Sequence, residues 1–265
     1  MDTSTRQTSR ASASRSSKTS STPIGATKFS RRSEAVAWSV GAGLEGKGVI
    51  VTGAAGGIGQ AVARAFAATG ARVMAIDLDQ TKVDELVAGL TGRGHIGVAA
   101  DLRIISSHAS LVARARRELG NLYVLANLAA VLRRRSSLDE ISEEDWDFQH
   151  DVNLKAAFFL CREAGKAMVA QGQGGRIITF TSQGWWTGGF GGSVVYAASK
   201  GGVVSMTRGL ARSLGPHHIT VNAVSPGQVN TPMLMTGLAP ELYEAMKQQT
   251  PLGYIAEPSG GFLMY

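Results

Sequence analysis

Residues 48–59 read Gly-Val-Ile-Val-Thr-Gly-Ala-Ala-Gly-Gly-Ile-Gly, a short apolar run followed at once by a glycine-rich turn. Helical periodicity resumes after Gly57, so the stretch predicts a buried strand, a tight turn and a helix in succession. Glycines let backbone amides approach a pyrophosphate closely, and the N-terminus of the following helix offers a favourable dipole to an anion. The stretch therefore predicts a dinucleotide-binding turn in an α/β domain.

The rest of the chain continues this alternation of short apolar or β-branched runs with helical periodicity, which is typical of a parallel, doubly wound sheet. Strands are expected over 48–51, 72–76, 96–99, 123–127, 176–181 and 220–224. Helices are expected near 57–69, 80–89, 106–119, 143–170, 194–214 and 239–248. Six strands in the order 3-2-1-4-5-6, joined by right-handed crossovers, predict a single Rossmann-type domain.

Composition favours one domain, because 265 residues with 44% hydrophobic and 18% charged side chains provide one sizeable core. The net charge of +7 is concentrated near the N-terminus, where residues 1–33 hold seven basic side chains and one acidic side chain. The remainder is close to neutral, which argues against nucleic acid as a partner.

The Ser-, Thr- and Arg-rich N-terminus predicts a disordered extension over 1–45, followed by the folded domain over 46–265. Its composition resembles a mitochondrial or plastid transit peptide, but an unstructured extension is favoured and the protein is expected in the cytoplasm. No run of about 18 apolar residues occurs, so no membrane span is expected. The single cysteine, Cys161, lies in an apolar run, and the five histidines show no ligand spacing, so no metal site is predicted.

Tyr196 and Lys200 form the second informative motif. They stand four residues apart in a helical stretch, so their side chains share one helix face. A free phenol has a pKa of about 10 and is a poor base at neutral pH, whereas a neighbouring cation favours the phenolate. Ser182 precedes the tyrosine by 14 residues and follows a predicted strand. These residues predict proton transfer beside a dinucleotide.

The order of these features, a glycine turn, an acidic residue, Ser, Tyr, Lys and then Pro226-Gly227, resembles the short-chain dehydrogenase/reductase family from about Gly46 to Pro258. The resemblance implies a Rossmann fold and an NAD(P)-dependent oxidoreductase that interconverts a secondary alcohol and a ketone. The turn follows the family's Thr-Gly-x-x-x-Gly-x-Gly pattern, through Thr52, Gly53, Gly57, Ile58 and Gly59.

An acidic residue at the end of the second predicted strand indicates the cofactor. Asp77 follows Gly59 by 18 residues, near the distance expected for a carboxylate on the adenosine ribose. Because a carboxylate repels a 2′-phosphate, NAD is favoured over NADP. Asp79 is the rival carboxylate, and a helix N-cap is the alternative role of Asp77. The resemblance assigns further cofactor contacts to Asp101, Leu102, Asn127, Ala129, Pro226, Gly227, Val229 and Thr231.

The same resemblance implies the roles of the reacting groups. Tyr196 is the acid/base, Lys200 lowers its pKa and binds the nicotinamide ribose, and Ser182 binds the substrate oxygen. Asn153 matches a helix asparagine whose backbone holds a relay water. Thr181 is an alternative hydroxyl, but an alternating strand directs it away if Ser182 points into the site.

The substrate is less clearly marked. Residues 133–146 resemble sugar-acid dehydrogenases of the family; a 3-oxoacyl-carrier reductase and a catalytically silent cofactor-binding fragment are the alternatives. Arg133-Arg134-Arg135 follows the fourth strand and predicts either attraction of a carboxylate or carrier-linked phosphate, or a solvated charged face. Trp185 and Trp186 predict an apolar wall over the substrate or a packing surface.

The C-terminal end departs from the family pattern. Residues 250–258 resemble the lead into a further helix and a seventh strand, but the sequence continues only through Ser259 to Tyr265. The domain is therefore interpreted as C-terminally truncated, with its sixth strand an exposed edge. The long helices near 143–170 and 194–214 are expected to pair subunits into a homodimer or homotetramer.

Overall fold

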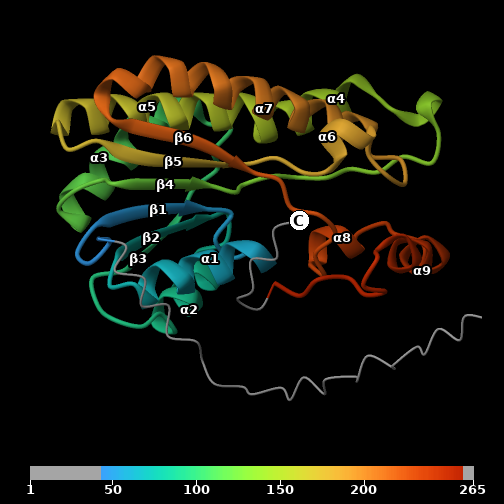
Figure 1. Cartoon of the computed structure of the whole chain (residues 1–265), viewed down its shortest axis with the longest axis horizontal. Coiled ribbons are helices and arrows are strands. Elements are labelled where there is room, and N and C mark those ends of the chain that lie inside the picture. Colours follow the sequence, from blue (N-terminus) through green and yellow to red (C-terminus); the bar gives the residue numbers. More distant parts are fainter. Residues whose placement is uncertain (1–42, 259–265) are drawn as a thin grey trace, which may run out of the picture. The chain divides into compact units, whose positions relative to one another are not determined.

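The computed structural model describes residues 43–258, which contain one six-stranded sheet with helices on both faces (Figure 1). Hydrogen-bonded neighbours follow the order β3-β2-β1-β4-β5-β6, and every pairing is parallel. The strands are β1 (Gly48–Thr52), β2 (Arg72–Asp77), β3 (Ile96–Ala99), β4 (Val124–Asn127), β5 (Gly175–Phe180) and β6 (Ile219–Val224). The predicted number and order of strands are confirmed for this part of the chain.

Helices pack on both faces of the sheet. The described α-helices are α1 (Gly57–Ala68), α2 (Gln80–Ala88), α3 (His108–Leu119), α4 (Glu143–His150), α5 (Ala157–Gln171), α6 (Gly184–Thr187), α7 (Val194–Leu214), α8 (Pro232–Met235) and α9 (Pro240–Gln249). Figure 1 shows α1 and α2 below the strands, α5 and α7 above them, and α8 and α9 beyond the strand tips. Residues of α3 share an apolar cluster with those of α5.

Alternation along β1 explains why the core has two sides. Val49 and Val51 join the apolar cluster under α1 and α2, whereas Ile50 joins the cluster under α3 and α5. All three side chains are fully buried, as expected for a central parallel strand. Burying each contributes about 1.5–3 kcal/mol to folding, which fixes the register of the strand. Cys161 also lies in the cluster under α3 and α5, where its thiol is buried.

The helix expected over 143–170 is interrupted. α4 ends at His150, a π-helical segment covers Asp151–Ala156, and α5 then continues to Gln171. A π turn inserts an extra residue into the helical repeat over a short stretch, and the sequence pattern predicted one continuous helix there. The four-residue helices α6 and α8 are likewise too short to predict from periodicity.

Parallel pairing brings the carboxyl ends of the strands to one edge of the sheet. Thr52, at the end of β1, pairs with Ile76 of β2 and with Asn127 of β4. Phe180 ends β5 opposite Val224 of β6. The segments that leave β1, β4 and β5 therefore emerge side by side, at the place where ligands bind in open α/β sheets.

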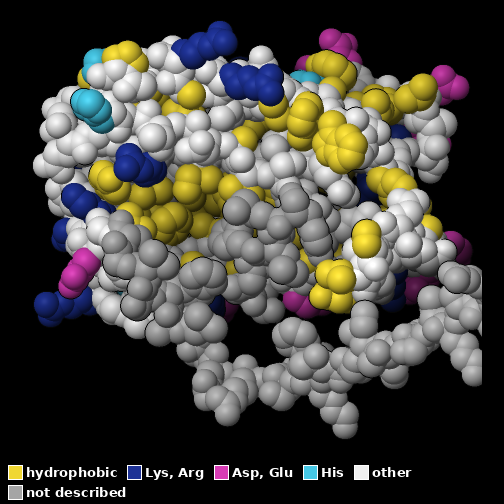
Figure 2. All heavy atoms as spheres, in the orientation of Figure 1, with side chains coloured by type: hydrophobic (Ala, Val, Ile, Leu, Met, Phe, Trp, Pro, Cys, Tyr) yellow, Lys and Arg dark blue, Asp and Glu magenta, His cyan; other side chains and the backbone are white. Residues whose placement is uncertain are grey.

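β6 forms an edge of the sheet, as predicted. Among residues 43–258 its one strand neighbour is β5, and its residues Thr220, Asn222 and Ala223 are exposed. Figure 2 shows hydrophobic side chains at the surface between α7 and α1, over the strands. Ile178 and Val224 are partly buried members of the apolar cluster on the α1 face.

Within residues 43–258, no helix combines the length and apolar character needed to cross a membrane. The predictions of a disordered or transit-peptide-like N-terminus and of an altered chain end concern residues 1–42 and 259–265, which lie outside the described residues.

Candidate active site

A cavity of about 680 Å³ runs along the carboxyl ends of the strands. Its volume is in the range of ligand pockets. Fifteen of the seventeen residues predicted for the site line it: Gly53, Gly57, Ile58, Gly59, Asp77, Asp101, Leu102, Ala129, Ser182, Tyr196, Lys200, Pro226, Gly227, Val229 and Thr231. The structure thus brings the glycine turn and the Ser-Tyr-Lys group together, although more than 120 residues separate them in sequence.

The glycine turn leaves no room for side chains. Gly53 has φ of 63°, and a Cβ there would lie 3.0 Å from Ala129. A Cβ at Gly59 would collide with the carbonyl oxygen of Gly53, and one at Gly57 would lie 2.8 Å from a methyl group of Thr231. These glycines allow the loop to approach its neighbours and a bound pyrophosphate closely, so the turn fits a dinucleotide.

Asp77 supports this turn from the end of β2. Its carboxylate accepts hydrogen bonds from the Ala55 amide at 2.9 Å and the Leu78 amide at 2.8 Å. Asp79 instead caps α2 by accepting from the Lys82 amide, and it pairs with the Lys82 ammonium at 3.7 Å. The N-cap therefore belongs to Asp79, while Asp77 holds the loop and faces the cavity.

Asp101 and Leu102 line the same end of the cavity. Asp101 forms a bidentate pair with Arg103, and the hydrogen bonds from that guanidinium lower the pKa of the carboxyl. Leu102 provides an apolar side chain at this end of the cavity.

Asn127, a predicted cofactor contact, is absent from the cavity lining. Its Oδ1 accepts from the Thr52 hydroxyl at 2.8 Å, and its side chain is buried between β1 and α5. The Thr52 oxygen in turn accepts from the amides of Leu128 and Ala129, each at 3.0 Å. Asn127 therefore shapes the loop after β4 rather than lining the cofactor site.

Ser182 follows β5, and Tyr196 and Lys200 lie in the first two turns of α7. The Lys200 ammonium donates to the Phe180 carbonyl oxygen at 2.8 Å and lies 5.6 Å from the centre of the Tyr196 ring. Thr181 donates its hydroxyl proton to the Lys200 carbonyl oxygen at 2.9 Å, so it braces α7. Both Thr181 and Ser182 line the cavity, but the Thr181 hydroxyl is already engaged.

The protonation of these groups is set by burial. Burial raises the pKa of Tyr196, while a hydrogen bond with Ser182 and the positive charge of Arg134 lower it. Burial lowers the pKa of Lys200 to about 8. The resemblance implied Lys200 as the cation that lowers the tyrosine pKa; in the structure the nearby charge with that effect is Arg134.

Asn153 lies in the π-helical segment and also turns its side chain away from the cavity. Its Nδ2 donates to the Val131 carbonyl oxygen at 2.9 Å and to the Ser199 hydroxyl oxygen at 3.1 Å, and its Oδ1 accepts from the Val131 amide at 2.8 Å. The side chain joins the segment after β4 to α7. A π turn at such a junction is a common feature of functional sites, because it redirects backbone groups.

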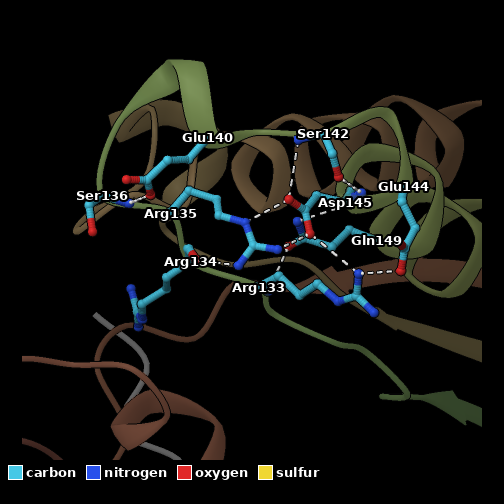
Figure 3. Close-up of polar contacts among 9 residues, drawn as sticks. All are labelled: Arg133, Arg134, Arg135, Ser136, Glu140, Ser142, Glu144, Asp145 and Gln149. Carbon is cyan, nitrogen blue, oxygen red and sulfur yellow. Dashed lines mark hydrogen bonds and ion pairs between the residues drawn. The ribbon is translucent and has the colours of Figure 1, made fainter.

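The three consecutive arginines separate into two kinds (Figure 3). Arg133 and Arg135 turn toward α4, where Asp145 pairs with both at 3.3 Å and 2.6 Å. Arg134 turns the other way and lines the cavity. The sequence showed a charged run but no signal that one member differs, because neighbouring residues leave an irregular loop in opposite directions.

Trp185 and Trp186 are absent from the cavity lining among the described residues, and Trp186 is 70% exposed. The two tryptophans therefore do not form an apolar wall of the cavity. The wall opposite Tyr196 comes from Phe190 and from the α8 segment, whose Thr231 hydroxyl caps α8 by accepting from the Leu234 amide. Within residues 43–258, no three His, Cys, Asp or Glu side chains are grouped to hold a metal ion.

The chain is similar in sequence to several known proteins. A family-wide sequence profile described as Enoyl-(Acyl carrier protein) reductase matches residues 53–260. The 2-dehydro-3-deoxy-D-gluconate 5-dehydrogenase of Escherichia coli (strain K12) is 40% identical over 189 residues, which cover 71% of this chain and 74% of the relative. The D-threitol dehydrogenase of Mycolicibacterium smegmatis is 37% identical over 217 residues, 81% of this chain and 82% of the relative.

The fold comparison gives the same family. The crystal structure of a protein described as a short-chain alcohol dehydrogenase from Sinorhizobium meliloti 1021 matches with a TM-score of 0.75 and 33% identity, covering 82% of this chain and 86% of that chain. The chain therefore belongs to the short-chain dehydrogenase/reductase family. Members of this family are oxidoreductases that use an NAD(P) nucleotide cofactor.

Proposed function

We propose that this protein is an NAD-dependent dehydrogenase that interconverts a secondary alcohol and a ketone. The observation that carries the proposal is the convergence of Ser182, Tyr196 and Lys200 on the cavity that also contains the glycine turn. A phenol, a hydroxyl and an ammonium beside a dinucleotide turn suit proton transfer coupled to hydride transfer. The catalytic domain is proposed to span residues 46–265.

In the direction of oxidation, Tyr196 accepts the proton of the substrate hydroxyl, and Ser182 donates a hydrogen bond to the same oxygen. The bound nicotinamide supplies the acceptor for the hydride that leaves the carbinol carbon. In reduction, Tyr196 returns the proton to the ketone oxygen. Lys200 binds the nicotinamide ribose, and the positive charge of Arg134 favours the phenolate.

The proposed cofactor is NAD rather than NADP, and Asp77 supports this choice. Its carboxylate is fixed by two backbone amides and lines the cavity, where it suits the 2′-hydroxyl of the ribose. A 2′-phosphate at that place would meet like charge, at a cost of roughly 1–4 kcal/mol. No basic side chain occupies positions 54–56 of the turn to offset it.

The proposed substrate is a sugar acid or a related polyol. The support comes from the relatives, one described as a 2-dehydro-3-deoxy-D-gluconate 5-dehydrogenase and another as a D-threitol dehydrogenase. A 3-oxoacyl-carrier reductase is the second candidate, since the matching family profile carries an acyl-carrier description. A substrate panel of sugar acids, alditols and 3-oxoacyl thioesters, followed by NADH absorbance, distinguishes the two.

The test of the reaction is Tyr196→Phe, which removes the titrating hydroxyl and keeps the ring. Turnover of the best substrate of the panel should fall by about 10²–10⁴, as for loss of a general acid/base. NADH affinity, measured by fluorescence titration, should be unchanged because the phenol does not hold the nucleotide. A Tyr196→Phe variant that retains wild-type turnover excludes the mechanism.

The protein is also proposed to be a homodimer or homotetramer paired through α5 and α7. The outer faces of these helices enclose a mainly apolar groove that includes Phe158, Val169, Met206 and Leu210. Phe158 is 40% exposed in the single chain. Light scattering after size-exclusion chromatography should give a molar mass that is a multiple of 27.7 kDa. Met206→Glu should lower this molar mass, because it places a charge in the apolar groove.

A further inference from the structure

The two ends of the cavity differ in charge. We call the end that contains the glycine turn and Asp77 the nucleotide end, and the end around Tyr196 the substrate end. The acidic side chains that line the cavity are Asp77, Asp79 and Asp101, and all three belong to the nucleotide end. Each already has partners, as described above. The substrate end, around Tyr196, is lined by Arg134 and Lys200 and by no carboxylate of the described chain. This end therefore has an excess of positive charge.

Asp145 explains why only one arginine of the run adds to that excess. It is buried, and it accepts from Arg135 Nε at 2.7 Å, from Arg135 Nη2 at 2.6 Å and from Arg133 Nη1 at 3.3 Å. Arg133 has a second acid partner in Glu144, at 3.0 Å. The charges of these two arginines are thus neutralised on α4, away from the cavity (Figure 3).

Arg134 has hydrogen-bond partners but no acid partner within the described residues. Its guanidinium donates to the carbonyl oxygens of Phe190 at 2.9 Å, Leu234 at 3.3 Å, Thr236 at 3.3 Å and Gly191 at 3.4 Å. Carbonyl groups satisfy N–H donors without cancelling the charge. Burial lowers the pKa of Arg134, as expected for a cation removed from water without a counter-ion.

A guanidinium has five N–H groups, and the four contacts above leave one of those on Nη2 without a partner. An incoming group with a single negative charge and an acceptor oxygen would both fill this donor and neutralise the cation. The surrounding wall, with Phe190, Leu234 and Met246, is apolar and strengthens such a pair by excluding water.

We propose that Arg134 is a specificity-determining residue that binds the carboxylate of a hydroxy-acid or oxo-acid substrate while the reacting carbon faces Tyr196. The proposal rests on the proposed function, because it assigns the substrate class of the same site. Its rival is a purely structural role, in which Arg134 holds the Phe190 loop and the α8 segment together and recognises nothing.

The test compares two probes that differ only at one end, D-gluconate with a carboxylate and D-glucitol with a hydroxymethyl group. Binding to the NADH complex is measured by calorimetry, which requires no turnover. The wild type should bind gluconate at least about tenfold more tightly than glucitol, as expected for a charge-assisted hydrogen bond. Arg134→Met should abolish that preference without changing NADH affinity, and Arg134→Lys should keep part of it.

Arg133→Met is the matched control, because it removes the same charge from the neighbouring residue outside the cavity and leaves Arg135 on Asp145. The control should keep the gluconate preference. The proposal is overturned if the wild type binds both probes equally, or if the Arg134 variants weaken both probes to the same extent, which is the result of a purely structural role. Arg134→Lys provides the same test should Arg134→Met fail to fold.

Tyr196→Phe separates this proposal from the proposed function. The variant should bind gluconate as the wild type does, because the carboxylate contact does not involve the phenol. If it also retains turnover, the proposed reaction fails while carboxylate binding by Arg134 stands. If gluconate preference is missing in the wild type but Tyr196→Phe is inactive, the reaction stands and the substrate class fails.

Discussion

The nucleotide end and the substrate end of the cavity are constructed differently. The nucleotide end is built from β1, β2, β3 and the turns that follow them, with the glycine loop and Asp77 within 25 residues of each other. The substrate end is assembled from distant segments, since Arg134 contacts the carbonyl groups of Leu234 and Thr236, about 100 residues away.

This difference has a physical origin. A pyrophosphate is bound by backbone amides, which every residue has, so the requirement falls on local conformation and on the absence of side chains. A small substrate is recognised by a few placed side chains, whose positions depend on loops packed from several parts of the chain. Perturbing each end should therefore have different consequences.

The largest effect is expected from Gly59→Ala at the nucleotide end. The added Cβ would collide with the Gly53 carbonyl oxygen, which belongs to rigid backbone. Such overpacking costs about 1–3 kcal/mol, and the loop must pack in this conformation to bind the pyrophosphate. NADH should therefore bind about 5- to 150-fold more weakly in a fluorescence titration. The control is Gly215→Ala, where φ is −53° and no atom of another segment lies within 4 Å of the new methyl group. If Gly59→Ala bound NADH with wild-type affinity, the close approach of Gly59 to the Gly53 carbonyl oxygen would not be required for binding.

Asp145→Asn tests the support of the substrate end. Hydrogen bonds from Arg135, together with those from Ser142 and Arg133, lower the pKa of Asp145 to about 2. The folded pKa lies below the ordinary value of 3.8, so this stabilisation is present above pH 4 and is lost as pH falls toward 2.

Asp145→Asn should therefore have a lower melting temperature than the wild type at pH 7, measured by circular dichroism. Between pH 4 and pH 2 its melting temperature should fall less than that of the wild type. Glu144→Gln is the control, because Glu144 is 79% exposed and its pair with Arg133 is screened by water. Equal melting temperatures of the wild type and Asp145→Asn at pH 7 would show that the ion pairs of Asp145 do not stabilise the arginine segment after β4.

A smaller effect is expected from Asp77→Asn, which removes the charge and keeps an oxygen to accept the Ala55 amide. The ratio of NADH affinity to NADPH affinity should fall by about tenfold, because the repulsion between the carboxylate and a 2′-phosphate is lost. Asp79→Asn retains the α2 cap and should change the ratio less. A larger change in the Asp79 variant would transfer cofactor discrimination to that residue.

The smallest expected effect concerns the pH dependence of turnover in Arg134→Met. The Arg134 charge lowers the pKa of Tyr196, so its removal should raise that pKa. Oxidation requires the phenolate, and the alkaline rise of kcat/KM for an uncharged alcohol should therefore move to higher pH. Arg133→Met should leave the pH profile in place, and a shift to lower pH in Arg134→Met would refute the electrostatic link between Arg134 and Tyr196.

Much of the fold and of the nucleotide end could be predicted from the sequence. Apolar alternation located all six strands within one or two residues, and glycine spacing located the turn, because both are local requirements. The side chains of Asn127 and Asn153, two residues predicted for the site, lie outside the cavity lining. Their side-chain amides pair with Thr52 and Val131, partners that the sequence gives no means of choosing. The water contact predicted for the Asn153 backbone stays a prediction.

What the sequence by itself determined is the position of the strands, the dinucleotide turn and the set of groups available for proton transfer. Each follows from a short-range property: side-chain periodicity, the missing Cβ of glycine, or the four-residue spacing of Tyr196 and Lys200. The tertiary structure decided which charges remain free. Arg133, Arg134 and Arg135 are chemically identical, and only the packing of α4 and α8 around them neutralises two and leaves Arg134 beside Tyr196.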